Sequence, residues 1–215
     1  AGFRGLIGVS TLGLEPVAKV GLPAGDAQAQ PGDVAVAPDG SVYVSDGATG
    51  GIYVCKPECD VLEPLVAKGR FRSAQGLAAM RDGRTLYVAD YGRGLFRIDL
   101  KKPAKITEVL PLKGIDGLVR DGEALIAIIN GDGRKVVRIS FDAEGRPSQQ
   151  LLDMPEGPGD PTLGTLIDRR LVYVADAQWD RFDASGKGLT PPRVTTLRTI
   201  ALPAIPATPR ARSKR

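Results

Sequence analysis

Histidine is absent from this 215-residue sequence. A serine or cysteine nucleophile activated by histidine, a histidine general base and a histidine-ligated zinc site are therefore excluded within this chain. The sequence also lacks a P-loop, a G-x-S-x-G motif and a glycine-rich dinucleotide motif. Hydrolysis by this chain would need a carboxylate or a metal-bound water. No apolar stretch approaches the roughly 20 residues of a transmembrane helix, so we expect no membrane span.

An excess of one charge is also lacking once the end of the chain is set aside. The sequence has 29 Lys and Arg against 25 Asp and Glu. Four of the bases lie in residues 203–215, which contain no acid: Arg210, Arg212, Lys214 and Arg215. Without them, 25 bases face 25 acids. We therefore expect a neutral folded body over residues 1–202, a disordered basic tail over 203–215 and no nucleic-acid partner.

Aromatic residues are scarce, at 5% of the sequence, whereas glycine (27) and proline (17) are abundant. This composition argues against long helices and predicts many short elements joined by tight turns. Hydrophobic residues make up 42% of the chain, which is enough to bury a sizeable core.

Four segments of the sequence repeat one pattern: residues 33–46, 76–90, 116–130 and 163–176. Each has an apolar strand, a turn containing Asp, and a second strand that ends in Asp or Asn. The strand-ending residues are Asp46, Asp90, Asn130 and Asp176, which are 44, 40 and 46 positions apart. A period in the low forties with four short strands per period is typical of a β-propeller blade. We therefore predict an all-β propeller.

The repeat predicts four four-stranded blades, at about residues 31–70, 74–112, 115–153 and 160–202. The third strand of a blade is expected at residues 135–141 in the third blade and at 181–183 in the fourth. Residues 5–10 and 15–22 resemble the two outer strands of a fifth blade, so residues 1–24 form a partial blade.

Four and a half blades do not close a ring, and open sheet edges expose unpaired backbone groups. We therefore expect this chain to be a fragment of a six-bladed propeller. Two alternatives stay open: a compact ring in which the N-terminal hairpin serves as a partial blade, or self-association through the open edge.

Two cysteines, Cys55 and Cys59, flank a three-residue turn between predicted strands at residues 52–55 and 61–66. A three-residue hairpin would bring them within disulfide reach, although two free thiols are an alternative. A disulfide would favour an oxidising compartment, so we expect a periplasmic or secreted protein, with a cytoplasmic location as the alternative.

The repeats resemble the SMP-30/gluconolactonase and NHL group of β-propellers, in a bacterial SMP-30-like branch of unclear function. The resemblance rests on residues 31–46, 76–90 and 115–118, and on residues 160–164 with 173–183 in the last blade. Lactonases of this group hold a divalent cation such as calcium with Glu, Asn, Asn and Asp ligands placed before the first strands of blades.

Carried over to this sequence, the resemblance implies Asp116 as metal ligand and catalytic base, with Asp33 and Gln75 as further ligands. Gly32 and Gln75 stand where the family has Asn, and no residue of this chain matches its Glu. Residues at the starts of first strands and ends of second strands would form a rim at the channel mouth. The predicted rim residues are Asp46, Asp90, Asn130, Thr162, Asp176 and Trp179. The aspartates among them have an alternative role as turn caps.

The leading hypothesis is a propeller scaffold that binds a small molecule or a protein at the channel mouth, without catalysis by this chain. A second hypothesis is a calcium-type, metal-dependent lactone or ester hydrolase. A third is an assembly module that pairs through its incomplete ring.

Overall fold

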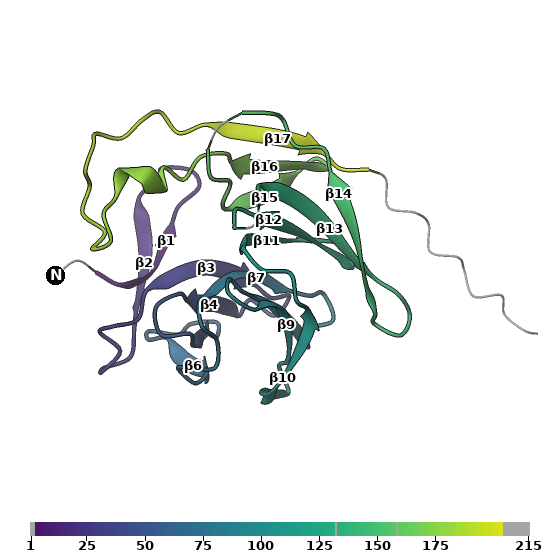
Figure 1. The fold of residues 1–215 in the computed structure, drawn as a ribbon. Coiled ribbons are helices and arrows are strands. Elements are labelled where there is room, and N and C mark those ends of the chain that lie inside the picture. The colour runs from purple at the N-terminus through teal and green to yellow at the C-terminus, as the bar shows by residue number, and fades with distance from the viewer. Residues whose placement is uncertain (1–2, 132, 158, 204–215) are drawn as a thin grey trace, which may run out of the picture.

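The computed structural model describes residues 3–131, 133–157 and 159–203 of the chain (Figure 1). Apart from one short 3-10 helix, the regular elements in this part of the chain are β-strands. The strands form antiparallel sheets, each built mostly from consecutive segments of sequence. Of the predicted basic tail at 203–215, all but Pro203 lies outside the described residues.

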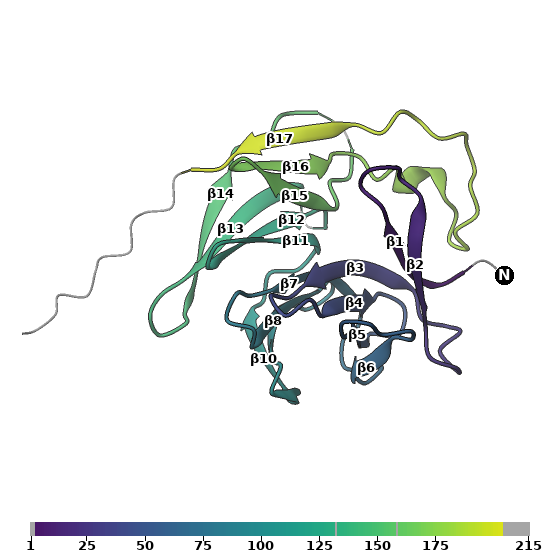
Figure 2. The ribbon, with the colours of Figure 1, turned by 180° about the vertical axis from the view of Figure 1, so that it is seen from behind.

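Four of these sheets are arranged as propeller blades, seen from two sides in Figures 1 and 2. Blade 1 contains β3 (Pro31–Val36), β4 (Val42–Asp46), β5 (Ile52–Cys55) and β6 (Glu63–Val66). Blade 2 contains β7 (Ala74–Ala79), β8 (Thr85–Asp90), β9 (Gly94–Asp99) and β10 (Lys102–Leu110). Blade 3 contains β11 (Ile115–Asp121), β12 (Ala124–Ile129), β13 (Lys135–Phe141) and β14 (Pro147–Leu152). The prediction of an all-β propeller with four blades is confirmed.

Among the described residues, blade 4 has three strands rather than the predicted four: β15 (Gly164–Ile167), β16 (Arg170–Val174) and β17 (Leu197–Ala201). The prediction of its third strand at residues 181–183 is wrong. The 3-10 helix η1 (Trp179–Arg181) ends at the first residue of that segment, and Asp183 caps an exposed turn by accepting the N–H groups of Ser185 and Lys187. The third strand forms at β17 instead, where Ile200 is buried between exposed neighbours.

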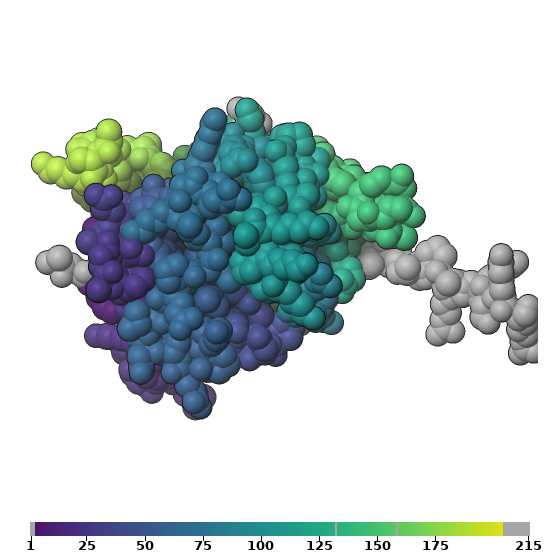
Figure 3. All heavy atoms as spheres, turned by 90° about the horizontal axis from the view of Figure 1, so that it is seen from below, coloured from purple at the N-terminus to yellow at the C-terminus, as the bar shows by residue number. Residues whose placement is uncertain are grey.

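Residues at the N-terminus form a separate hairpin of β1 (Gly5–Val9) and β2 (Pro16–Gly21). Leu6, Val20 and Leu22 pack against a buried cluster of blade 1 that includes Tyr53 and Leu62. Figure 3 shows this N-terminal segment, in purple, lying against the blue atoms of blade 1. The hairpin thus covers the face of blade 1 opposite to blade 2.

The core consists of layers between successive blades. One cluster fills the space between blades 1 and 2, a second joins blades 2 and 3, and a third joins blades 3 and 4. Strands in the middle of a blade are therefore apolar on both faces. All six residues of β12, with the sequence ALIAII, are buried for this reason.

Glycine permits close contact between the first strands of successive blades, which lie side by side around the channel. A Cβ on Gly76 in β7 would lie 2.6 Å from the backbone nitrogen of Leu118 in β11. A Cβ on Gly117 would lie 2.8 Å from the carbonyl oxygen of Thr162. A larger residue at either position would push two blades apart.

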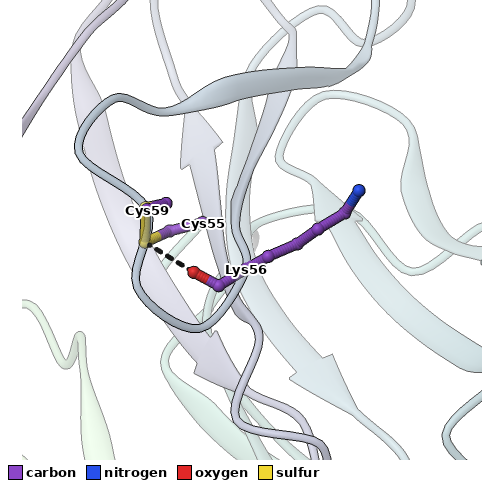
Figure 4. The surroundings of a disulfide bond; sticks show 3 residues. All are labelled: Cys55, Lys56 and Cys59. Carbon is purple, nitrogen blue, oxygen red and sulfur yellow. Dashed lines mark hydrogen bonds between the residues drawn. A yellow bond between two sulfur atoms is a disulfide. The ribbon is translucent and has the colours of Figure 1, made fainter.

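The structure contains a disulfide between Cys55 and Cys59, with Cα atoms 5.5 Å apart (Figure 4). The connection around it is longer than the sequence suggested, because β6 begins at Glu63 rather than at residue 61. Residues 56–62 form the loop, and the disulfide closes its first turn, in which Glu58 has a φ of 66°.

We expect Gly76→Ala to lower the free energy of unfolding by about 1–3 kcal/mol, because its methyl group would collide with the backbone of the next blade. Urea denaturation would measure the change. Gly188→Ala is a matched control, since no atom lies within 4 Å of its added Cβ, and its effect should stay within about 0.5 kcal/mol. Equal effects of the two substitutions would contradict this account of blade packing.

Candidate functional site

One end of the channel carries a hollow of about 380 Å³, here termed the mouth pocket. Its walls come from three blades, because the start of each first strand and the end of each second strand lie at this end. The lining residues are Ser73, Gln75 and Tyr91 of blade 2, Asp116 and Asn130 of blade 3, and Asp160 and Trp179 of blade 4. The pocket therefore gathers residues more than 100 positions apart in the sequence.

Hydrogen bonds within the wall fix several of these side chains. The Tyr91 hydroxyl donates to Asn130 Oδ1 at 2.9 Å, and Asn130 Nδ2 donates to Asp116 Oδ2 at 2.8 Å. On the blade 2 side, Gln75 Nε2 donates to Ser73 Oγ at 2.8 Å. Because Asn130 uses both ends of its amide, it sets the orientation of Asp116.

Asp33 lies deeper, in the wall of the channel rather than in the mouth pocket. One carboxylate oxygen accepts the backbone N–H of Val34, and the other accepts that of Leu77 in the next blade at 2.8 Å. Val34 and Leu77 occupy equivalent places in blades 1 and 2, because they pair with equivalent positions of β4 and β8. The residue before this place is Asp33 in blade 1 and Gly76 in blade 2. A carboxylate thus joins blades 1 and 2 at a position where blade 2 has glycine.

Burial raises the pKa of Asp33 to about 6, and the negative charge of Asp116 adds to this rise. The two backbone N–H groups act in the opposite direction, because they stabilise the carboxylate. Asp33 and Asp116 are therefore close enough to interact electrostatically, although they line different hollows.

The predicted cation ligands do not fit a calcium site in this arrangement. Calcium takes six to eight oxygen ligands. Both oxygens of Asp33 accept backbone N–H groups, and one oxygen of Asp116 accepts the Asn130 amide, which leaves one oxygen each from Asp116 and Gln75. The described part of the chain contains no group of three or more Asp, Glu, Cys or His side chains able to hold a metal.

The predicted rim divides into residues that line the pocket and residues that cap turns. Asn130 and Trp179 line it. Asp46 accepts the N–H groups of Gln30, Ala48 and Thr49, and Asp90 those of Arg72 and Gly92. Asp176 accepts the N–H of Gln178 and forms an ion pair with Arg193. The backbone N–H of Thr162 donates to the carbonyl of Val174. These four therefore contact the chain itself rather than the pocket.

Trp179 is held at the pocket by an anchored loop. Gln178 has a left-handed φ of 58°, and its buried amide both donates to the carbonyl and accepts the N–H of Arg193. The Arg193 guanidinium also pairs with Asp180 and Asp176. The Trp179 side chain itself remains 57% exposed. The loop thus fixes its backbone and leaves an aromatic face open to a ligand.

Sequence reasoning missed three pocket residues as site candidates: Ser73, Tyr91 and Asp160. Tyr91 directly follows the strand-ending Asp90, so the position after that Asp was the available signal. Ser73 and Asp160 each lie a few residues before a first strand, where irregular loop geometry hides which side chains turn toward the pocket.

Comparison with known proteins supports the fold. No protein-family model matches the chain, and the search of curated proteins found no match. Among solved structures, the nidogen/laminin complex matches with a TM-score of 0.62 and 19% identity, over 90% of this chain and 75% of that chain. A streptogramin B lyase matches with a TM-score of 0.55 and 16% identity, over 87% of this chain and 59% of that one.

A virginiamycin B lyase from Staphylococcus aureus, a catalytically inactive histidine-to-alanine variant with quinupristin, matches with a TM-score of 0.58. Its identity is 17%, over 91% of this chain and 62% of that one. The chain therefore spans about three fifths of the length of these lyases. At such identities the likeness establishes the fold alone, and the chain is a β-propeller protein.

Within the described residues, no helix is long and apolar enough to cross a membrane.

The raised pKa of Asp33 predicts a dependence of stability on pH. Between the ordinary value of 3.8 and about 6, the folded protein binds this proton more tightly than the unfolded chain does. The contribution of Asp33 to the free energy of unfolding should therefore be full below pH 4 and fall as pH rises through 6. Relative to Asp33→Asn, we expect wild type to lose about 2–3 kcal/mol between pH 4 and 7.

Chemical denaturation of both proteins at a series of pH values would measure this difference. Asp33→Asn keeps the shape of the side chain and removes its titration, so other groups largely cancel. A stability difference that does not change between pH 4 and 7 would contradict the assignment.

Proposed function

We propose that this propeller binds a small organic molecule in the mouth pocket and does not itself catalyse a reaction. The observation that carries the proposal is the pocket of about 380 Å³, in which polar groups from three blades converge beside an exposed tryptophan. Small-molecule sites commonly have this size and a few convergent polar groups.

Several features argue against catalysis by these residues. The chain has no histidine, so it cannot supply the residue type whose replacement inactivates the virginiamycin B lyase. Asp116, the predicted base, is held by Asn130 through one of its oxygens. No serine or cysteine of the pocket has a general base as hydrogen-bond partner in the described structure: Ser73 donates to the carbonyl of Gly47.

We further propose that the protein is of the SMP-30/NHL type and is exported. The motifs named above support the first point, and the Cys55–Cys59 disulfide supports the second, because such bonds persist in oxidising compartments. A protein ligand at the same end of the propeller is an alternative to a small molecule. It is favoured by the similar nidogen structure, which is that of a complex with laminin.

The metal-dependent lactone or ester hydrolase is the second candidate function. The proximity of the Asp116 and Gln75 oxygens in one pocket favours it. We expect calorimetric titration with calcium to show no binding in the micromolar range and lactone assays to show no turnover, because too few oxygens converge. Micromolar calcium binding that Asp116→Ala abolishes would instead support the hydrolase and contradict the scaffold.

Ligand binding is testable through Gln75. After screening of a small-molecule library by thermal shift, calorimetry on Gln75→Ala should show about two- to tenfold weaker binding of the hits, the effect of one lost hydrogen bond. Gln149→Ala, an exposed glutamine on β14, is the matched control and should bind as wild type does. The proposal fails if no compound binds, or if both substitutions weaken binding equally.

A further inference from the structure

We propose that the mouth pocket is built for a small organic ammonium ion. This inference rests on the proposed binding function and names its ligand class. Three properties of the wall carry it: the sign of its charge, two open hydrogen-bond acceptors and an aromatic face.

The charged residues of the wall have one sign. Asp116 and Asp160 line the pocket, and among the described residues no Lys or Arg does. Arg134 lies outside and pairs with Asp160, its Nη2 3.5 Å from Asp160 Oδ1, so it offsets part of that charge, whereas Asp116 forms no ion pair among the described residues. Asp33, in the wall of the channel, is a further carboxyl group close enough to Asp116 to interact with it electrostatically. The negative field therefore extends from the pocket into the channel.

Two oxygens of the wall are open hydrogen-bond acceptors. The Tyr91 hydroxyl and one N–H of each of the Asn130 and Gln75 amides donate to wall oxygens. The second oxygen of Asp116 and Oε1 of Gln75 accept no hydrogen bond from the described residues. These acceptors fit a ligand that donates, and a primary ammonium group donates three hydrogen bonds.

The aromatic face is that of Trp179, which the Gln178–Arg193 contacts hold at the rim. Tryptophan attracts an organic cation through its π-system more strongly than other aromatic side chains do. An ammonium group that donates to Asp116 and Gln75 would share the pocket with this ring. Carboxylates and phosphates would be repelled by the same aspartates.

The test uses three probes of equal shape and different charge: cyclohexylmethylammonium, cyclohexylmethanol and cyclohexanecarboxylate. Trp179 is the single tryptophan of the sequence, so its fluorescence reports directly on the pocket, and calorimetry gives the affinities. We expect the ammonium probe to bind at least tenfold more tightly than the alcohol and the carboxylate not to bind, because the alcohol has no charge to pair with Asp116 and donates one hydrogen bond instead of three.

Asp116→Asn removes one charge with little change in shape and should reduce the preference for ammonium over alcohol to less than about threefold. Glu123→Gln is the matched control, because it removes one charge from the exposed turn between β11 and β12, at the other end of these strands. It should retain the full preference.

The outcomes separate this inference from the binding function on which it rests. Equal binding of ammonium and alcohol, or an unchanged preference in Asp116→Asn, overturns the assignment of an ammonium ligand and leaves the binding pocket in place. If neither these probes nor any library compound binds, the binding function itself fails.

Discussion

Close contact between the first strands of neighbouring blades is the constraint on which this structure depends. Gly76 and Gly117 allow backbone atoms of successive blades to approach more closely than any side chain permits. This contact aligns the blades around the channel, and the alignment brings the loops of three blades to one mouth. The pocket is therefore a consequence of packing between blades, because no single blade supplies more than three of its residues.

Asp33 shows how one side chain alters that packing. Where the next blade has Gly76, blade 1 has a carboxylate that accepts N–H groups from its own strand and from Leu77. The hydrogen bonds stabilise the junction, while burial of the charge opposes it. Asp33 thus connects blades 1 and 2 in the wall of the channel, whereas Gln75 and Asp116 line the mouth pocket.

The fold was largely predictable because each blade is formed by consecutive strands and turns, and because their pattern recurs along the sequence with a regular spacing. The exception, the third strand of blade 4, was misplaced because a long loop with η1 interrupts the repeat before β17.

Predicting the site was harder. Four residues were expected at the mouth and do line the pocket: Gln75, Asp116, Asn130 and Trp179. By contrast, the contacts of Asp33 and of the strand-ending Asp46 and Asp90 depend on backbone N–H groups from other parts of the chain. Such partners have no signal in a sequence pattern.

The layered core has a consequence for how the molecule loses its structure. Each buried cluster joins only units that are adjacent in the sequence, so blades 2 and 3 have a blade packed on both faces, whereas blade 1 has blade 2 on one face and the N-terminal hairpin on the other. Such a nearest-neighbour arrangement resembles a linear array, in which cooperativity passes along the chain from unit to unit. Amide protons in the central blades would then exchange with solvent last, and the ligand-facing loop of blade 4 could open while the interior stays closed.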